Sequence, residues 1–373
     1  MKSKLLFLLL LLGSSYITAQ TVIENPPFET RQGSIHTISK IELSPTETRL
    51  TIRTVFRPQW WTSLDSLTYI YAPESKKQLY PLRIEGRKFG EQVTTPASGI
   101  IEDDCVITYP PLPEGTTRID WMDDNLNSET NTYGILLVKP QETKEQASLR
   151  KIHGNWQQAD AQNGWDIGIY DSLAIMDNRF WKYDLCRKQG KKFKLNLKDE
   201  TGEQCLLEIT QEKDGNLCIG KNGGKANKYI RAGRPQRNYA ATTAATAPQT
   251  AFFRKDTVHI RGFLDGYSPK LGFTTVLIYT DNHITNEGTP AVVTIHPDGR
   301  FESDFVVNYP GVHHLSMGNN WMTFYIRPGE TLMLYINWED HLDYLRQRRL
   351  KPMLTETCLL YTSPSPRDGA TSR

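Results

Sequence analysis

Cysteines are the first residues to consider for chemistry, because a close pair can exchange disulfides or bind a metal. Outside residues 358–373 the chain has four, at Cys105, Cys186, Cys205 and Cys218. No two are separated by two residues, so there is neither a redox pair nor a zinc knuckle. Cys205 and Cys218 flank a hairpin expected at residues 213–216, which would keep them from facing each other directly. A disulfide is open to them in an oxidising compartment, but reduced, half-buried thiols are favoured.

Histidines and carboxylates are the next candidates, as metal ligands or acid–base groups. His313-His314 is the only adjacent histidine pair, and neighbours on a strand point to opposite faces, so strand polarity explains it better than a shared metal. Glu102-Asp103-Asp104 and Asp123-Asp124 are interpreted as solvated turn residues rather than catalytic carboxylate pairs.

Two further motifs can be interpreted either as functional sites or as purely structural features. Gly220-Lys221-Asn222-Gly223-Gly224-Lys225 resembles a phosphate loop, but it lacks the right spacing and a following helix, so a hairpin turn is expected. Trp60-Trp61 could form a flat sugar-stacking platform, although core packing with one exposed neighbour is favoured. No nucleophile elbow or dinucleotide fingerprint occurs. The sequence therefore predicts no catalytic, cofactor-binding or metal-binding residue.

The elements that would position such residues are strands. In residues 20–142, hydrophobic side chains alternate with polar ones around Leu50-Phe56 and Leu67-Tyr71, and further strands are expected at residues 106–109 and 119–121. Short strands separated by Pro and Gly predict an N-terminal β-sandwich.

A second group of strands follows in residues 147–230. His153-Gly154-Asn155-Trp156 opens it, and tight polar turns separate the later strands. A Gly-x-Trp step at the start of a meander favours a small lipocalin-like barrel, in which Trp156 either packs in the core or lines a ligand cavity. Residues 231–251 are rich in Ala and Thr and are interpreted as an interdomain linker.

A second β-sandwich is predicted for residues 252–340, with seven or eight strands and turns at Pro297-Asp298-Gly299-Arg300 and Arg327-Pro328-Gly329-Glu330. The stretch from Trp338 to Arg349 is the first helical signal, and residues 341–357 are expected to begin a helical segment. The predicted fold class is all-β, with two sandwiches flanking the barrel.

Both ends of the chain have distinct origins in this interpretation. Lys2 and Lys4, an apolar run from Leu5 to Leu12 and Ala19 predict a cleaved signal peptide over residues 1–19, and hence a periplasmic or otherwise extracytoplasmic location. Residues 358–373 fit neither a helix nor a strand period. They resemble the translation of a transposon-based sequencing adapter, which would make the chain a metagenomic fragment cut off near residue 357.

The ends also account for the basic charge of the whole chain. Lys2, Lys4, Arg367 and Arg373 are four of the 44 basic residues and Asp368 is one of the 42 acidic residues, so the rest has a formal charge of −1. This balance gives no reason to expect a nucleic-acid or anionic-membrane partner. No later segment is apolar enough to cross a membrane, and protein partners in the envelope are expected.

Two regions resemble a known family. The N-terminal sandwich of TlpA-like thiol–disulfide oxidoreductases is similar to residues 24–29, Arg57-Pro58-Gln59-Trp60-Trp61, and Pro110-Pro111-Leu112-Pro113 with Ile119-Asp120. Residues 297–301 and 325–340 resemble the second sandwich of the same proteins, which precedes a helical segment and a thioredoxin domain. The resemblance implies a redox enzyme of the Gram-negative periplasm that acts through a Cys-x-x-Cys motif. No position in this chain matches that motif.

Two hypotheses remain open. In the first, the chain is the non-catalytic N-terminal part of an exported thiol–disulfide oxidoreductase whose thioredoxin domain is missing here. In the second, it is a non-enzymatic periplasmic or surface protein whose β-domains bind protein or glycan. The sequence does not name a substrate or an oligomeric state.

Overall fold

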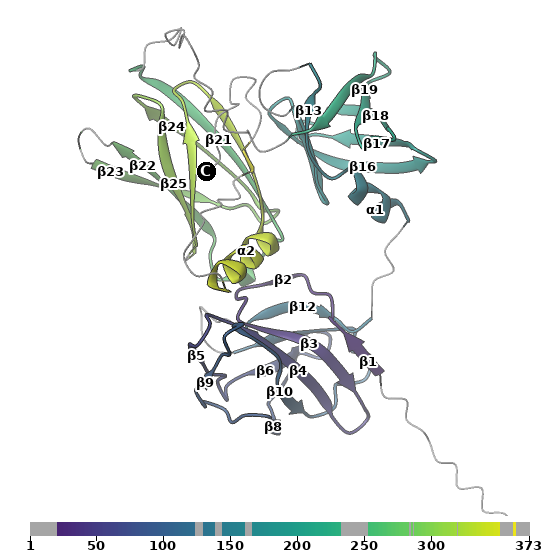
Figure 1. The fold of residues 1–373 in the computed structure, drawn as a ribbon, viewed down its shortest axis with the longest axis vertical. Helices are drawn as coiled ribbons and strands as arrows, with labels where there is room; N and C mark the ends of the chain where they lie inside the picture. Colours follow the sequence, from purple (N-terminus) through teal and green to yellow (C-terminus); the bar gives the residue numbers. More distant parts are fainter. Residues whose placement is uncertain are drawn as a thin grey trace, which may run out of the picture. The chain divides into compact units, whose positions relative to one another are not determined.

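The computed structural model describes residues 21–123, 130–138, 144–160, 166–232, 253–282, 285, 287–318, 320–350 and 361–362. The expected signal peptide, nearly all of the Ala/Thr-rich linker and most of the C-terminal tail lie outside these residues. The chain divides into two compact units, one of residues 1–28, 35–124 and 130–139, the other of residues 29–34, 125–129 and 140–373. Strands make up most of the described residues of both units (Figure 1), so the predicted all-β class is confirmed.

The first unit is built from antiparallel strands in two main sheets. Its strands are β1 (Thr21–Glu24), β3 (His36–Leu43), β4 (Thr48–Val55), β5 (Trp61–Thr62), β6 (Tyr69–Ala72), β7 (Lys77–Leu79), β8 (Arg83–Glu85), β9 (Val93–Thr94), β10 (Ile100–Tyr109), β11 (Arg118–Met122) and β12 (Thr132–Leu136). One sheet has the order β1-β3-β4-β10-β8, and β12-β11-β6-β7 are neighbours in the other. β5 and β9 form a separate two-stranded ribbon.

A shared core holds the two sheets together. Trp121 of β11 and Tyr109 of β10 are fully buried in it, and the Trp121 Nε1–H donates a hydrogen bond to the Tyr109 hydroxyl at 3.0 Å. The predicted strands all occur, and β12 is one of several strands that the structure adds. Four of the five β12 residues are buried, so this strand lacks the alternation of polar and apolar side chains that reveals a half-buried strand.

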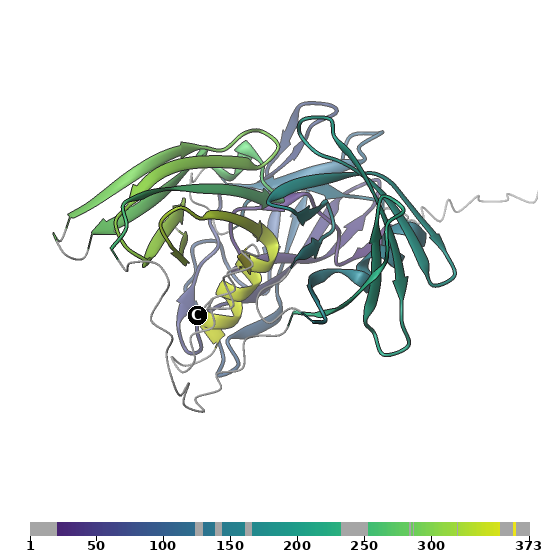
Figure 2. The same ribbon diagram turned by 90° about the horizontal axis from the view of Figure 1, so that it is seen from above.

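The second unit begins with β2 (Thr30–Arg31), α1 (Lys144–Leu149) and the 3₁₀ helix η1 (Arg150–Ile152). A closed antiparallel barrel follows, coloured teal in Figures 1 and 2. Its strands are β13 (Gly154–Gln158), β14 (Ile167–Ile169), β15 (Leu173–Met176), β16 (Arg179–Gln189), β17 (Lys192–Lys198), β18 (Gln204–Gln211), β19 (Leu217–Lys221) and β20 (Asn227–Arg231). α1 corrects the expectation that the first helix begins at Trp338, because six residues are too few to show a helical period.

Side-chain alternation explains the barrel. Along β17, Phe193, Leu195 and Leu197 are buried while the residues between them are exposed. Trp156 is also buried among these apolar side chains. Its Nε1–H donates to the Ile152 carbonyl at 2.9 Å. Trp156 thus packs in the core, one of the two roles expected for it.

The remaining strands of the second unit form two sheets around another core. The elements are β21 (Asp256–Asp265), η2 (Pro269–Leu271), β22 (Thr275–Asn282), β23 (Glu287–Thr294), β24 (Arg300–Val307), β25 (Gly311–Met317), β26 (Asn320–Ile326), β27 (Thr331–Asn337), α2 (Trp338–Leu350) and β28 (Tyr361–Thr362). The sheet orders are β24-β21-β27-β28 and β23-β22-β25-β26, and β21 runs parallel to β27. β28 lies in the tail, where the sequence predicts no strand.

α2 follows β27 directly and appears yellow in Figure 2. The Asn337 Oδ1 caps its first turn by accepting a hydrogen bond from the Asp340 N–H at 2.9 Å. The Trp338 Nε1–H donates to the Arg31 carbonyl at 2.7 Å, and the Arg31 guanidinium pairs with the Glu339 carboxylate. No helix among the described residues is long and apolar enough to cross a membrane.

Candidate functional site

Trp60 and Trp61 lie at the start of the β5–β9 ribbon and are 54% and 53% exposed. The expectation that one of them packs in the core is therefore wrong. Two adjacent exposed indoles are unusual, because tryptophan side chains are mostly buried. Large apolar side chains that are exposed together often mark a contact surface. We call residues 57–62 and 93–95 the tryptophan ribbon.

Backbone hydrogen bonds hold the tryptophan ribbon in one shape. The Trp60 N–H donates to the Arg57 carbonyl, and the Thr95 N–H donates to the Trp60 carbonyl at 2.8 Å. The Thr95 hydroxyl also donates to the Arg57 and Trp60 carbonyls. Gln59 has a φ of +59°, a left-handed conformation that side-chain-bearing residues adopt at a cost. The exposed indoles thus sit on a fixed turn.

Arg57 gives the tryptophan ribbon its charge. Its guanidinium carbon lies 4.9 Å from the centroid of the Trp60 ring, so the cation covers one ring face and the indole attracts it electrostatically. Gln59 and Thr94 are exposed beside the tryptophans. The surface therefore combines two large apolar rings, one cation and several hydrogen-bonding groups.

A buried polar network supports the tryptophan ribbon from inside the first unit. The Arg87 Nη1 lies 2.7 Å from the Asp104 Oδ2, and the Arg87 Nη2 donates to the Thr62 and Glu91 carbonyls. The Thr54 hydroxyl donates to the same Asp104 oxygen at 2.6 Å. Asp104 was expected to be solvated, and its burial corrects that expectation. The network connects β5, through Thr62, and the segment just before β9, through Glu91, to β4 and β10.

His36 completes this network. Its Nδ1 lies 2.9 Å from the Thr54 hydroxyl and its Nε2 lies 3.1 Å from the Thr62 hydroxyl. Burial, helped by the nearby Arg87 cation, lowers the pKa of His36 to about 4. The imidazole is therefore neutral near pH 7. Because the network is enclosed, it can position the ribbon but is closed to a substrate.

The four described cysteines form no disulfide. Thr210, and not Cys205, lies opposite Cys218 in the β18–β19 ladder, which confirms that these two cysteines do not face each other. Burial raises the pKa of Cys105 to about 12 and also raises the pKa of Cys205. The pKa of Cys218 is raised by its hydrogen bond to Glu212. These three thiols lack the lowered pKa of a redox nucleophile.

The other sequence candidates have structural roles. His313 is buried and His314 is half-buried on β25, consistent with opposite faces, and no metal-binding cluster of His, Cys, Asp or Glu occurs among the described residues. Gly220 and Lys221 end β19, and the next residues form the hairpin to β20, as predicted.

Asp123 is the second carboxylate for which the expected solvent exposure is wrong. It was expected to be solvated, but it is buried, and its Oδ2 accepts a hydrogen bond from the Thr130 hydroxyl at 2.7 Å. Its N–H donates to the Asn131 Oδ1 at 2.7 Å. Asp124 lies outside the described residues.

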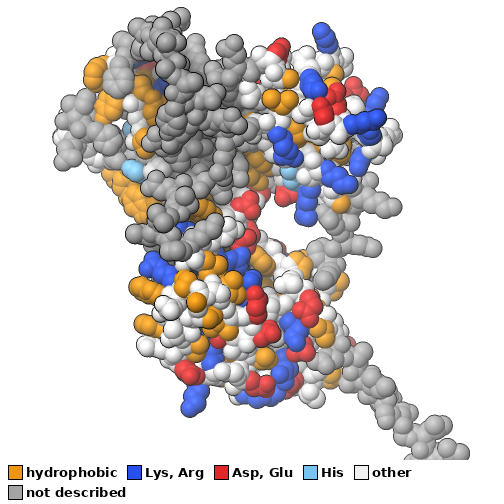
Figure 3. Space-filling model, in the orientation of Figure 1, with side chains coloured by type: hydrophobic (Ala, Val, Ile, Leu, Met, Phe, Trp, Pro, Cys, Tyr) orange, Lys and Arg blue, Asp and Glu red, His pale blue; other side chains and the backbone are white. Residues whose placement is uncertain are grey.

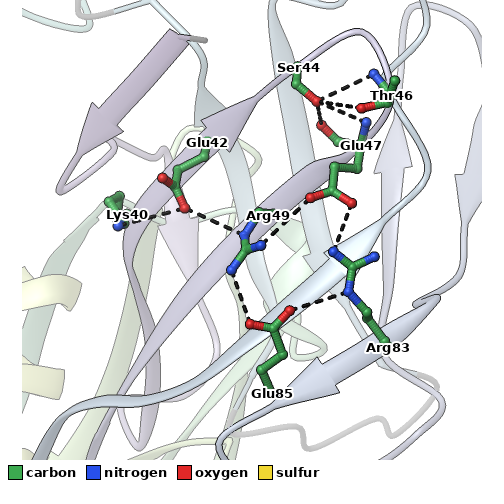
Figure 4. Close-up of polar contacts among 8 residues, drawn as sticks. All are labelled: Lys40, Glu42, Ser44, Thr46, Glu47, Arg49, Arg83 and Glu85. Carbon is green, nitrogen blue, oxygen red and sulfur yellow. Dashed lines mark hydrogen bonds and ion pairs between the residues drawn. The ribbon is translucent and has the colours of Figure 1, made fainter.

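Two other polar sites are networks of ion pairs. On the surface of the first unit, Arg49 and Arg83 each contact Glu47 and Glu85, and Lys40 and Glu42 extend the network (Figure 4). In the second unit, a cleft of about 250 Å³ contains arginines and glutamates. Its Arg261 and Arg300 both contact Glu200. Arg179, the third arginine of the cleft, contacts Asp199 and Glu203, so each lining arginine has a carboxylate contact.

Comparisons with known proteins assign no family to this chain. No protein-family model matches the chain, and no curated protein sequence matches it. Among solved structures, a pullulanase from Bacillus acidopullulyticus aligns with 80% of this chain and 34% of that chain, at 8% identity and a TM-score of 0.16. The chain thus spans about a third of the pullulanase length, and a likeness this weak carries no argument about fold or function.

Proposed function

We propose that this chain is a non-catalytic binding region that docks a protein partner through the tryptophan ribbon. The observation that carries the proposal is the exposure of Trp60 and Trp61 on a turn held rigid by buried contacts. Trp and Arg are the residues that most often dominate binding energy at protein interfaces. A fixed turn also reduces the entropy that is lost when a partner binds.

The composition of the tryptophan ribbon favours a protein over a glycan. A sugar stacks on an open indole face, and Arg57 already covers one face of Trp60. A protein surface can use the edges of both rings together with the Arg57 guanidinium. A glycan partner is the alternative, and the experiment must distinguish it from a protein partner.

The resemblance to TlpA-like proteins supports a wider role. We propose that the chain is the accessory part of an exported thiol–disulfide oxidoreductase and acts outside the cytoplasm. The pKa values of Cys105, Cys205 and Cys218 are raised. This agrees with an accessory region that binds a partner while another domain carries out the disulfide chemistry. In an insulin-reduction assay we expect no activity from this chain, and clear turnover would contradict the accessory role.

Photo-crosslinking tests the docking surface directly. A photoreactive amino acid at position 60 should capture a discrete protein from an envelope extract, and adding Trp61→Ala should abolish the adduct. A matched probe at Lys225, an exposed residue in a barrel turn, should not capture that protein. The proposal fails if both positions capture the same proteins. It also fails if position 60 captures no protein while purified glycans protect the fluorescence of Trp60 and Trp61 from quenching by acrylamide.

A further inference from the structure

Five basic side chains lie on the outer surface of two neighbouring barrel strands. They are Lys182 and Arg187 on β16 and Lys192, Lys194 and Lys198 on β17, and we call them the basic face. All five are exposed. Figure 3 shows Lys and Arg side chains over this part of the barrel, which Figure 1 labels β16 and β17. The near-neutral charge of the whole chain hides this cluster.

The pairing of the two strands places like charges opposite each other. Arg187 is the direct partner of Lys194, and Lys182 is the direct partner of Lys198. Like charges at directly opposed positions destabilise a sheet. Two such pairs in one hairpin therefore oppose folding, and an anionic ligand would relieve the repulsion.

Nearby carboxylates neutralise only part of the basic face. Lys194 pairs with Glu208 at 2.8 Å, and Lys182 lies 3.5 Å from Asp298. Asp184 is exposed on β16 between the two like-charged pairs. Within the described part of the chain, no carboxylate oxygen lies within 4.0 Å of a basic nitrogen of Arg187, Lys192 or Lys198. These three cations are available to a ligand.

The geometry of the basic face fits a linear ligand. Lys192, Lys194 and Lys198 occupy three of the four outward positions of β17, and the uncharged Asn196 occupies the fourth. From Lys192 to Lys198 the row extends for about 20 Å at roughly 3.4 Å per residue. No exposed residue of β16 or β17 is aromatic, which removes the stacking platform that single-stranded nucleic acid uses. Leu185 is the one large exposed hydrophobic residue on these two strands, too little apolar surface to enter a bilayer.

From this geometry we infer that the basic face binds a linear acidic polysaccharide, a polymer with carboxylate or sulfate groups on successive sugars. The chain of sugars lies along β17, with Arg187 and Lys192 contacting its anionic groups. This site is separate from the tryptophan ribbon, and its failure would leave the proposed docking function untouched.

Binding of fluorescein-labelled heparin and of polygalacturonate to the full chain tests this inference. The variant R187Q/K192Q removes two cations that have no described carboxylate partner, and the control K213Q/K225Q removes two exposed turn lysines of the same barrel. We expect affinity for at least one polymer to fall about tenfold in the first variant and less than twofold in the second. Affinity should also fall as salt is added.

The melting temperature supplies a readout that does not depend on the ligand. If the repulsion is real, R187Q/K192Q melts at the same or a higher temperature than the unmodified chain, so weaker binding cannot come from unfolding. Equal losses in both variants, or no binding of either polymer at low salt, would overturn the inference. Tighter binding to phosphatidylglycerol vesicles or single-stranded DNA, lost in R187Q/K192Q, would overturn it in favour of that ligand class.

Discussion

The Arg87 Nη1 and the Asp104 Oδ2 lie 2.7 Å apart, and the two side chains are 1% and 2% exposed. Arg87 also donates to the backbone carbonyl of Thr62 on β5 and to that of Glu91, two residues before β9. One buried ion pair thus connects the interior of the first unit to the surface that carries Trp60 and Trp61. A buried charge that loses its partner is costly, because the remaining ion is left without water.

Arg87→Ala should destabilise the first unit by about 3–5 kcal/mol, because it leaves the Asp104 carboxylate buried and uncompensated. Urea unfolding followed by tryptophan fluorescence measures this free energy. The control is Arg83→Ala in the exposed network of Figure 4, which removes contacts to Glu47 and Glu85 and should cost much less than Arg87→Ala, because water screens exposed ion pairs. Equal costs for the two variants would show that the buried pair contributes no more than a surface pair.

Acid should weaken the first unit through His36. The folded-state pKa is about 4 and the ordinary value is 6.5, so between these pH values the unfolded chain binds more protons than the folded one. Stability is therefore fully present above pH 6.5 and is lost as the pH falls towards 4, by about 3 kcal/mol in total. Urea unfolding at pH 7.0 and at pH 4.0 should show this loss.

The variant His36→Gln isolates this contribution. Carboxylates elsewhere in the chain also titrate in acid, but they are the same in the variant and cancel in the comparison. His36→Gln should lower the free energy of unfolding at pH 7.0, and the difference from the unmodified chain should shrink at pH 4.0. An unchanged difference would mean that His36 does not titrate with a lowered pKa.

The strands were predictable where one face is buried and the other is solvated. Phe193, Leu195 and Leu197 alternate with polar residues, so β17 could be found from the sequence alone. β12 could not, since burial on nearly every position removes the alternation. The short helix α1 was missed for a different reason, because six residues are too few to show a helical period. The alternation of apolar and polar residues reveals a strand only when one face of the strand is buried and the other is exposed to solvent.

The candidate site was less predictable because its partners are distant in sequence. Asp104 follows two other acidic residues and looks like part of a solvated turn, but Arg87 and Thr54 lie across the sheet from it. Trp60 and Trp61 look like core residues by type, and the turn that exposes them depends on Thr95. The basic face was hidden for another reason. Composition gives the net charge, whereas strand register decides which charges meet.

Cys218 should become more reactive when Glu212 loses its charge. The Cys218 thiol donates a hydrogen bond to the Glu212 Oε1 at 3.2 Å, and this contact raises the pKa of Cys218. Glu212→Gln removes the negative charge that disfavours the thiolate, so the rate of reaction with a disulfide reagent at pH 8 should rise several-fold. The variant Cys218→Ser identifies which thiol reacts. An unchanged rate in Glu212→Gln would show that the carboxylate does not control this thiol.

Gly262→Ala should disrupt the second sandwich because β24 leaves no room for a side chain there. Gly262 lies directly opposite Phe301, and a Cβ at Gly262 would lie 2.0 Å from the Phe301 Cζ. Phe301 is buried, so relieving the overlap would push its ring or the strand out of place, at a cost of about 1–3 kcal/mol or more. The double variant Gly262→Ala/Phe301→Ala provides the control. In the Phe301→Ala background the added methyl group meets empty space, and Gly262→Ala should cost little or stabilise the strand. Denaturant unfolding of the four proteins in this cycle gives the coupling, and equal effects of Gly262→Ala in both backgrounds would rule out the steric explanation.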